Sequence, residues 1–387
     1  MEQHCSILRL NNDFGMRIVV LGPAHPYRGG LATIMMTMAR EMQSRGDEVK
    51  VYTFSLQYPS LLFPGKSQTV DTPAPQDLYI ERVVNTCNPL NWIALGRRLY
   101  HEAPDMILMK YWTPFMAPCF GTIARLARRN GKTKVVCQID NVEPHEHHII
   151  DKPFNRYYLG AVDGFVYMSE QVHGELTAYT SAPMLYSPHP MFENFGERVE
   201  REEACRKLGI DSHYRYMLFF GLIRDYKGLD MLLEAFERIE DRSLRLLVAG
   251  EFYNDKEQYR ALLDRLGDRV MLHDRFIADE DVKYYFSAAE ALVLPYRTAT
   301  QSGVTQIAYN FSLPMVVTRV GGLPEIVADG KVGVVCEPTV ESIAEAISEL
   351  DDKHLAIFAK NFPEERKRFS WAAMCDKIVE VYVMTTK

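Results

Sequence analysis

The sequence contains no long apolar run and no paired cysteines. The longest candidate for a membrane span, residues 103–120, is interrupted by Asp105, Lys110 and two prolines. No basic-then-apolar leader opens the sequence, and the seven cysteines stand singly with no CxxC pair. We therefore expect a cytoplasmic chain that neither spans a membrane nor leaves the cell by the usual route, with reduced thiols.

An excess of positive charge is also missing. The formal net charge of -7 excludes a nucleic-acid binder that works by broad neutralisation of phosphates. The hydrophobic share of 47% is too high for a mostly disordered chain. A length of 387 residues predicts roughly two to three units of ~150 residues, and we take two domains as the starting expectation.

Apolar runs and helical patterns alternate along both halves of the chain, which is typical of a doubly wound parallel α/β sheet. Strands are expected at 16–22, 49–54, 106–109, 135–139 and 164–167, then at 216–220, 244–249, 270–272, 291–295, 315–318 and 332–335. Helices are expected at 31–46, 120–129, 229–239, 259–266, 305–311, 340–350 and 370–383. The periodicity lapses over residues 183–200, so we expect domains at 1–195 and 196–369, followed by a C-terminal helix at 370–387.

Two glycine-containing loops before helices could bind a phosphate group. Residues 221–228 place Arg224 and Lys227 between a strand and a helix, and residues 300–304 (TQSGV) precede another helix. Gly29 and Gly30 follow the first strand and allow a close backbone approach. Solvated loop charges and an ordinary glycine turn remain the alternatives. No GxxxxGK[ST] segment occurs and no GxGxxG follows the first strand, which argues against kinase-like chemistry and dinucleotide redox chemistry.

A polar segment, DNVEPHE, follows the strand expected at 135–139. Asp140 could accept a proton from an acceptor hydroxyl, with Asn141, His145 and Glu146 beside it on the acceptor side. A simple turn cap is the alternative for Asp140. The histidines lack HExxH order, and the acidic run 279–281 favours a helix start, so no metal site is expected.

Long segments of the chain resemble the retaining family-4 glycosyltransferases of the GT-B fold. In the second half these are FFGLIRDYKGLDMLLEAF, LVAGEFY, TQSGVTQIAY and PMVVTRVGGLPEIVADGKVGVV; in the first half they are MRIVVLGPAHPYRGGLAT, QIDNVEPHEHH and SPHPMFENFG. The resemblance implies two Rossmann-like domains facing across a cleft, with the last helix crossing back to the first domain. It also implies that Arg224 and Lys227 contact the diphosphate of a nucleotide sugar.

Further donor contacts follow from the same resemblance. Glu251, Phe276 and Ile277 would flank the nucleobase, and the amides of Gly303 and Val304 would stabilise the leaving group without a metal. Many members carry two glutamates eight positions apart between Pro295 and Pro314, but this interval holds no acidic residue. Gln301, Ser302 and Gly303 stand at the first position, as in a branch of the family with the same TQSG segment.

The sequence thus predicts a retaining, metal-independent hexosyltransferase that needs no cofactor beyond its nucleotide-sugar co-substrate. Its acceptor would be a growing surface polysaccharide or a glycolipid such as lipopolysaccharide. A nucleotide-sugar 2-epimerase and a non-catalytic scaffold of a glycan assembly complex are the alternatives. A basic stretch, Arg125 to Lys134 with Arg97 and Arg98, is either a solvated helix face or a contact with anionic lipid at the inner face of the membrane. The sequence leaves the base, the sugar and the oligomeric state open.

Overall fold

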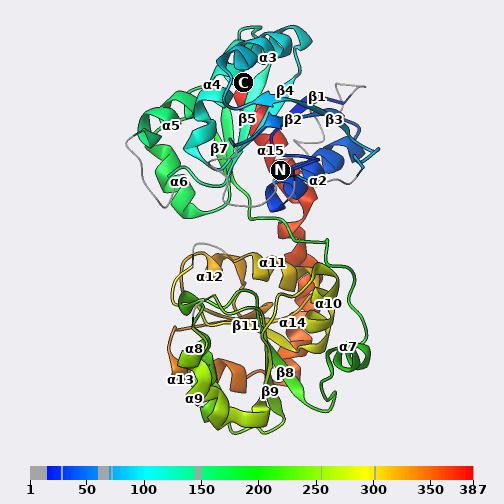
Figure 1. Cartoon of the computed structure of the whole chain (residues 1–387), viewed down its shortest axis with the longest axis vertical. Helices are drawn as coiled ribbons and strands as arrows, with labels where there is room; N and C mark the ends of the chain where they lie inside the picture. Colours follow the sequence, from blue (N-terminus) through cyan, green and yellow to red (C-terminus); the bar gives the residue numbers. More distant parts are fainter. Residues whose placement is uncertain are drawn as a thin grey trace. The chain divides into compact units, whose positions relative to one another are not determined.

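The chain folds into two compact units, of which the first is Met1–Pro188 with Trp371–Lys387 and the second is His189–Ser370 (Figure 1). This computed structural model describes residues 15–27, 29–59, 69–70, 73–143, 150–253, 255–299 and 302–386. Each unit holds its own parallel sheet, as the alternating pattern predicts.

The first unit is built on a seven-stranded sheet with the order β3-β2-β1-β4-β5-β6-β7. Its strands are β1 (Arg17–Leu21), β2 (Glu48–Leu56), β3 (Tyr79–Asn85), β4 (Met106–Tyr111), β5 (Lys134–Ile139), β6 (Gly164–Tyr167) and β7 (Met184–Tyr186). Its helices are α2 (Gly30–Ser44), α3 (Pro89–Glu102), α4 (Ala117–Arg128), α5 (Asp151–Leu159), α6 (Glu170–Thr177) and α15 (Trp371–Thr386). All six residues of β4 are buried, because helices cover both faces of a parallel sheet.

The last helix of the chain belongs to this first unit. α15 packs against β5, β6 and α2, and it buries Met374, Cys375 and Ile378 in their core. A Cβ atom at Gly164 would lie 2.4 Å from Cγ1 of Val381, so glycine at the start of β6 allows the helix to approach the sheet. The return of the C-terminal helix to the first domain is confirmed.

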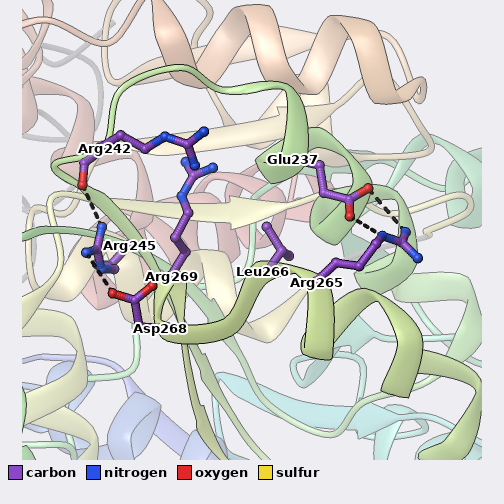
Figure 2. A pocket seen from close by; sticks show the side chains of 7 residues that line it. All are labelled: Glu237, Arg242, Arg245, Arg265, Leu266, Asp268 and Arg269. Carbon is purple, nitrogen blue, oxygen red and sulfur yellow. Dashed lines mark hydrogen bonds and ion pairs between the residues drawn. The ribbon is translucent and has the colours of Figure 1, made fainter.

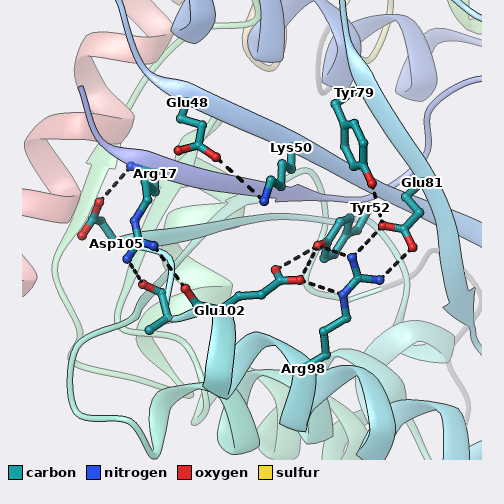
Figure 3. A network of polar contacts seen from close by, with 10 residues as sticks. Arg17, Glu48, Lys50, Tyr52, Tyr79, Glu81, Arg98, Glu102 and Asp105 are labelled. Carbon is teal, nitrogen blue, oxygen red and sulfur yellow. Dashed lines mark hydrogen bonds and ion pairs between the residues drawn. The ribbon is translucent and has the colours of Figure 1, made fainter. Parts of the chain in front are cut away.

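An arginine on α3 ties together the elements at one margin of this sheet (Figure 3). Arg98 forms ion pairs with Glu81 of β3 and Glu102 of α3, each at 2.7 Å, and donates to the Tyr52 hydroxyl at 2.8 Å. The Tyr52 hydroxyl also donates to Glu102 at 2.8 Å. Burial and the neighbouring carboxylate raise the pKa of Tyr52, so the phenol stays protonated and keeps its donor role.

The second unit has a six-stranded sheet with the order β10-β9-β8-β11-β12-β13. The strands are β8 (Arg215–Phe220), β9 (Leu244–Ala249), β10 (Val270–His273), β11 (Ala291–Leu294), β12 (Met315–Thr318) and β13 (Gly333–Cys336). The helices are α7 (Arg201–Leu208), α8 (Leu229–Arg238), α9 (Glu257–Leu266), α10 (Asp279–Ala288), α11 (Gly303–Asn310), α12 (Leu323–Ile326), α13 (Val340–Ser348) and α14 (Asp352–Glu365), with short 3₁₀ turns η3 (Asp225–Lys227) and η4 (Gly267–Arg269).

The expected strands agree with the structure to within two residues at either end, and the doubly wound α/β class is confirmed for both units. Several elements were not expected from the sequence pattern, among them the strands β3 and β7 and the helices α3, α5, α6, α7 and α14. β3 is an edge strand that carries charges, β7 has only three residues, and α14 contains Pro363. Each departs from the apolar periodicity that reveals buried elements.

The division between the units lies at Pro188/His189 rather than at the expected 195/196. Met191 is buried in the core of the second unit, and its amide donates to the Phe369 carbonyl at 2.8 Å. The second unit therefore begins at His189, several residues before the boundary that the sequence composition led us to expect. Among the described residues, no helix has the length and apolarity that a membrane crossing requires.

Candidate active site

The strand order of the second sheet reverses between β8 and β11. These strands lie side by side, and the chain continues from them in opposite directions along the sheet, which makes this carboxyl edge the topological switch point where ligands bind in open α/β sheets. The loop 221–228 follows β8, and residues 295–302 follow β11. Both candidate phosphate loops of the sequence therefore meet at the topological switch point of one unit.

Gly221 brings the two loops into contact. Its φ angle is 94°, and a Cβ atom there would lie 3.3 Å from Nζ of Lys227 and 3.7 Å from Cγ2 of Val304. The Lys227 ammonium consequently lies beside the first turn of α11. Glycine at 221 supplies both the positive φ angle and the space for these groups.

Lys227 is a buried cation for which no residue in the described part of the chain serves as a counter-ion. The residue is 8% exposed, and Nζ lies 5.8 Å from the centre of the Tyr296 ring. Within the described residues, no hydrogen bond or ion pair engages this ammonium group. Burial, and to a smaller extent the positive charge of Arg224, lower the pKa of Lys227 to about 8.

Arg224 is the second cation at the switch point. Its guanidinium group stacks on the Tyr253 ring at 4.1 Å, and no carboxylate of the described residues pairs with it. The neighbouring Arg297 behaves differently, because it pairs with Asp230 at 2.5 Å and donates to the Asp225 carbonyl. Arg224 and Lys227 therefore leave an uncompensated positive charge where a diphosphate could bind.

The N-terminus of α11 adds hydrogen-bond donors to these charges. Ser302 is the N-cap residue, but its hydroxyl lies 3.3 Å from the Tyr296 hydroxyl and does not cap the helix. The amides of Gly303 and Val304 open the helix and have no intrahelical acceptor. A Cβ atom at Gly303 would lie 3.4 Å from the Phe192 ring, so an aromatic residue of the linker borders the helix start.

The residues expected around the nucleobase follow β9 and β10 at the same edge. Gly250 has a φ angle of 147°, and a Cβ atom there would lie 2.2 Å from the Gly221 carbonyl oxygen. Glu251 is exposed, and its carbonyl accepts from the Ile223 amide at 2.8 Å. Phe276 is 70% exposed, whereas Ile277 is buried. Phe276 therefore presents an apolar surface to solvent after the edge strand β10, and the buried Ile277 follows it.

In the first unit, Asp140 lies at the carboxyl end of β5 and is held by a buried lysine. Lys110, the penultimate residue of β4, is fully buried and its ammonium lies 2.8 Å from Oδ1 of Asp140. Gln138 accepts from the same ammonium and donates to Oδ1 at 3.0 Å. Oδ2 of Asp140 has no partner in the described part of the chain and remains available as a proton acceptor. Its partners among the described residues are Lys110 and Gln138.

The remaining expected residues of the first unit are distributed as follows. Gly29 (φ 102°) is the N-cap residue of α2 and Gly30 begins the helix, and a Cβ atom on either would meet open space. Asn141 is exposed beside Asp140. His145 and Glu146, and Gln301 of the second unit, lie outside the described residues.

The acidic run and the basic stretch have structural roles. Asp279, Glu280 and Asp281 occupy the first turn of α10, so the predicted helix start is confirmed. Within the basic stretch, Arg128 pairs with Asp163 at 2.6 Å and Lys132 with Asp105 at 2.9 Å. These intramolecular ion pairs reduce the charge that the stretch could offer to lipid headgroups.

Sequence reasoning missed Lys110, Tyr253 and Tyr296. Lys110 stands inside an apolar strand, and a charged residue in a buried strand is itself a signal of a buried partner. Tyr253 was missed because the apolar pattern of the sequence shows where a strand ends but not in which direction the following side chains point. Tyr296 follows β11 directly, at the edge where ligands bind in open α/β sheets.

Comparison with known proteins agrees with this geometry. Residues 214–353 match the family described as "Glycosyl transferases group 1". The D-inositol 3-phosphate glycosyltransferase of Corynebacterium glutamicum (strain R) is 29% identical over 210 residues, or 51% of this chain and 48% of that protein. The protein of the same description from Corynebacterium diphtheriae is 32% identical over 199 residues, or 48% of this chain and 46% of that one. The matches thus span about half the length of these curated relatives.

Solved structures share the fold over nearly the whole chain. Sucrose-phosphate synthase from Thermosynechococcus elongatus superimposes with a TM-score of 0.64 at 18% identity, over 95% of this chain and 98% of that one. HepE of Anabaena, solved in complex with UDP, gives a TM-score of 0.65 at 16% identity, over 94% and 99%. Residues 214–353 are thus similar to group 1 glycosyltransferases, and the whole chain has the GT-B fold.

Proposed function

We propose that this protein transfers a hexose from a nucleotide sugar to a glycan or glycolipid acceptor, with retention of configuration and without a metal ion. The observation that carries the proposal is the pair of cations Arg224 and Lys227, which no carboxylate of the described residues pairs with, beside the first amides of α11. These groups would stabilise the diphosphate as the bond to the anomeric carbon breaks. The likeness to a protein solved with UDP supports this assignment.

Asp140 would act on the acceptor. Its Oδ1 atom is held by Lys110 and Gln138, so the carboxylate is fixed in position while Oδ2 can accept the hydroxyl proton. In this reading Lys110 is a positioning residue that orients Asp140. The relatives act on an inositol phosphate by their names, whereas the acceptor of this chain is proposed only as a class.

The test is transfer of radiolabelled sugar from a panel of nucleotide sugars to membrane extracts, with EDTA present. Arg224→Ala and Lys227→Ala should each lower kcat/KM by about 30-fold, equivalent to ~2 kcal/mol of lost transition-state stabilisation. Arg206→Ala on the exposed face of α7 removes the same charge outside the site and should leave kcat/KM unchanged. Unchanged kcat/KM in both site variants would refute the proposed role of the pair.

A non-catalytic nucleotide-sugar binder is the second candidate. The interval from Pro295 to Pro314 contains no acidic residue, so the carboxylates that many related enzymes place there are missing. Nucleotide binding without any turnover, together with a stable partner protein, would favour this candidate. Conversion of the donor alone, followed by NMR without acceptor, would instead indicate the 2-epimerase.

A further inference from the structure

A second cationic site lies in the same unit at the opposite edge of the sheet. A cavity of about 680 Å³ opens there (Figure 2). It is lined by Glu237, Arg242, Arg245, Arg265, Leu266, Asp268 and Arg269. Arg242 and Arg245 stand at the start of β9, and Arg269 directly precedes β10. The cavity, which we call the arginine pocket, therefore lies at the amino-terminal edge, whereas the switch-point site lies at the carboxyl edge.

The carboxylates of the arginine pocket do not balance its arginines. Glu237 is engaged by Arg265 at 2.5 and 3.2 Å. Asp268 approaches Arg245 only to 3.5 Å, with a side chain that is 85% exposed. An ion pair that is so exposed to water does little to compensate the positive charge of the arginines. Four arginines thus face two carboxylates, of which one is fully used.

Arg269 is the most constrained of the four. The residue is 5% exposed, and its guanidinium group donates to the carbonyl oxygens of Phe236 at 2.8 Å and Asp241 at 3.4 Å. Its Nε atom is buried and has no hydrogen-bond partner in the described part of the chain. Carbonyl groups compensate a positive charge less than a carboxylate does, so the site carries a desolvated cation with an unused donor.

Arg242 adds a second uncompensated charge beside it. Figure 2 shows the guanidinium groups of Arg242 and Arg269 next to one another with no carboxylate between them. Burial and the positive charges of Arg242 and Arg245 lower the pKa of Arg269, and the smaller opposite effects of Asp241 and Asp268 do not cancel this shift. The nearest other carboxylate, Asp241, pairs with Arg215 at 3.6 Å and accepts from Ser243 at 2.7 Å. Two like charges are therefore held together, and no carboxylate in the described part of the chain forms an ion pair with either of them.

We propose that the arginine pocket binds the phosphate group of a small dissolved ligand. A phosphate oxygen placed between Arg242 and Arg269 would accept from both forks and would offer an acceptor to the unpaired Nε atom. Arg245 is already oriented by the Arg242 carbonyl at 2.6 Å and by the face of the Tyr214 ring, so it can contribute its charge without reorganisation. This site is independent of the proposed transfer reaction, because none of its residues belongs to the switch-point site.

Methyl NMR on the full chain tests the proposal, because a methyl-bearing residue marks each site. Leu266 lines the arginine pocket, and Val304 lies beside Lys227. Titration with inorganic phosphate and with pyrophosphate should move the Leu266 signal along a saturating curve. Arg242→Ala should raise the half-saturating concentration for Leu266 at least tenfold and should leave the Val304 titration unchanged. Arg206→Ala, the same charge change on α7, should alter neither curve.

A variant with the opposite sign makes the test symmetric. Asp268→Asn removes the exposed carboxylate and should lower the half-saturating concentration for Leu266 by at least twofold. Arg242 is exposed and its guanidinium group holds no part of the fold, so the variants should keep the circular dichroism of the parent. A Leu266 signal that does not move, or that titrates identically in Arg242→Ala, would overturn the proposal whatever the Val304 signal does.

Discussion

The buried ammonium of Lys227 should make the unliganded protein less stable than a neutral variant. In Lys227→Met the aliphatic stem is kept and the charge is removed. Burial lowers the pKa of Lys227 from its ordinary value of 10.5 to about 8, so the folded state disfavours the charged form. That difference corresponds to about 3 kcal/mol, which is the upper limit of the stability that Lys227→Met should gain at pH 7.

The sign of the pH dependence is fixed by the same shift. Between about pH 8 and 10.5 the unfolded chain holds the Lys227 proton and the folded chain does not, so the stability of the parent rises with pH in that window. Below pH 8 the full penalty is present. The stability difference between parent and Lys227→Met should therefore be largest below pH 8, shrink through the window and vanish above pH 10.5.

Urea denaturation at several pH values, with and without UDP, measures these effects. At a ligand concentration of 100 Kd the parent should gain about 2.7 kcal/mol, and Lys227→Met should gain much less at the same concentration. Lys207→Met, on the exposed side of α7, controls for the loss of a surface charge. A Lys227→Met protein that is less stable than the parent at pH 7 without ligand would refute the reasoning.

Three further outcomes follow from the geometry of the two units. Gly250→Ala should destabilise the second unit by ~2 kcal/mol or more in urea denaturation. The new Cβ atom would lie 2.2 Å from the Gly221 carbonyl oxygen, and residue 250 has a φ angle of 147°. Unchanged stability would contradict this close approach. Lys110→Met should cost ~3 kcal/mol of stability, because it leaves the Asp140 carboxylate without its buried partner. The same variant should lower kcat more than it raises KM. Equal stability of variant and parent would exclude a buried ion pair. Tyr253→Ala should weaken nucleotide binding by ~1 kcal/mol in calorimetry, because the ring that stacks on Arg224 is lost. Tyr253→Phe keeps the ring and should bind the nucleotide like the parent. The same loss of affinity in both variants would indicate that the hydroxyl is responsible instead.

The sequence predicts the fold well because the buried strands are strongly patterned. β4, β9 and β12 are buried throughout and mostly apolar, so their limits are visible without any tertiary information. β3 has an exposed, charged face at the sheet edge, and only its pairing with β2 makes it a strand. Its formation depends on a partner far along the chain, which a local pattern does not contain.

The sequence predicted which loops form the candidate site, but it did not predict the contacts that their side chains make. The positions of Arg224, Lys227 and Gly303 follow from strand ends and helix starts, which sequence spacing reports. The stacking of Arg224 on Tyr253, the burial of Lys227 under Tyr296 and the grip of Lys110 on Asp140 depend on side-chain directions set by packing. Sequence spacing alone therefore located the loops, whereas only the structure showed which groups lie next to each charged side chain.

The most direct test of the central claim is calorimetric titration of UDP and GDP into the parent and into a variant that carries Arg224→Ala and Lys227→Met together. If the switch point of the second sheet holds the diphosphate, the parent binds one of these nucleotides. The double variant then loses at least ~100-fold in affinity, about the sum of two charge-assisted contacts. Binding of equal strength in both proteins, or no binding of either nucleotide to the parent, would contradict the account.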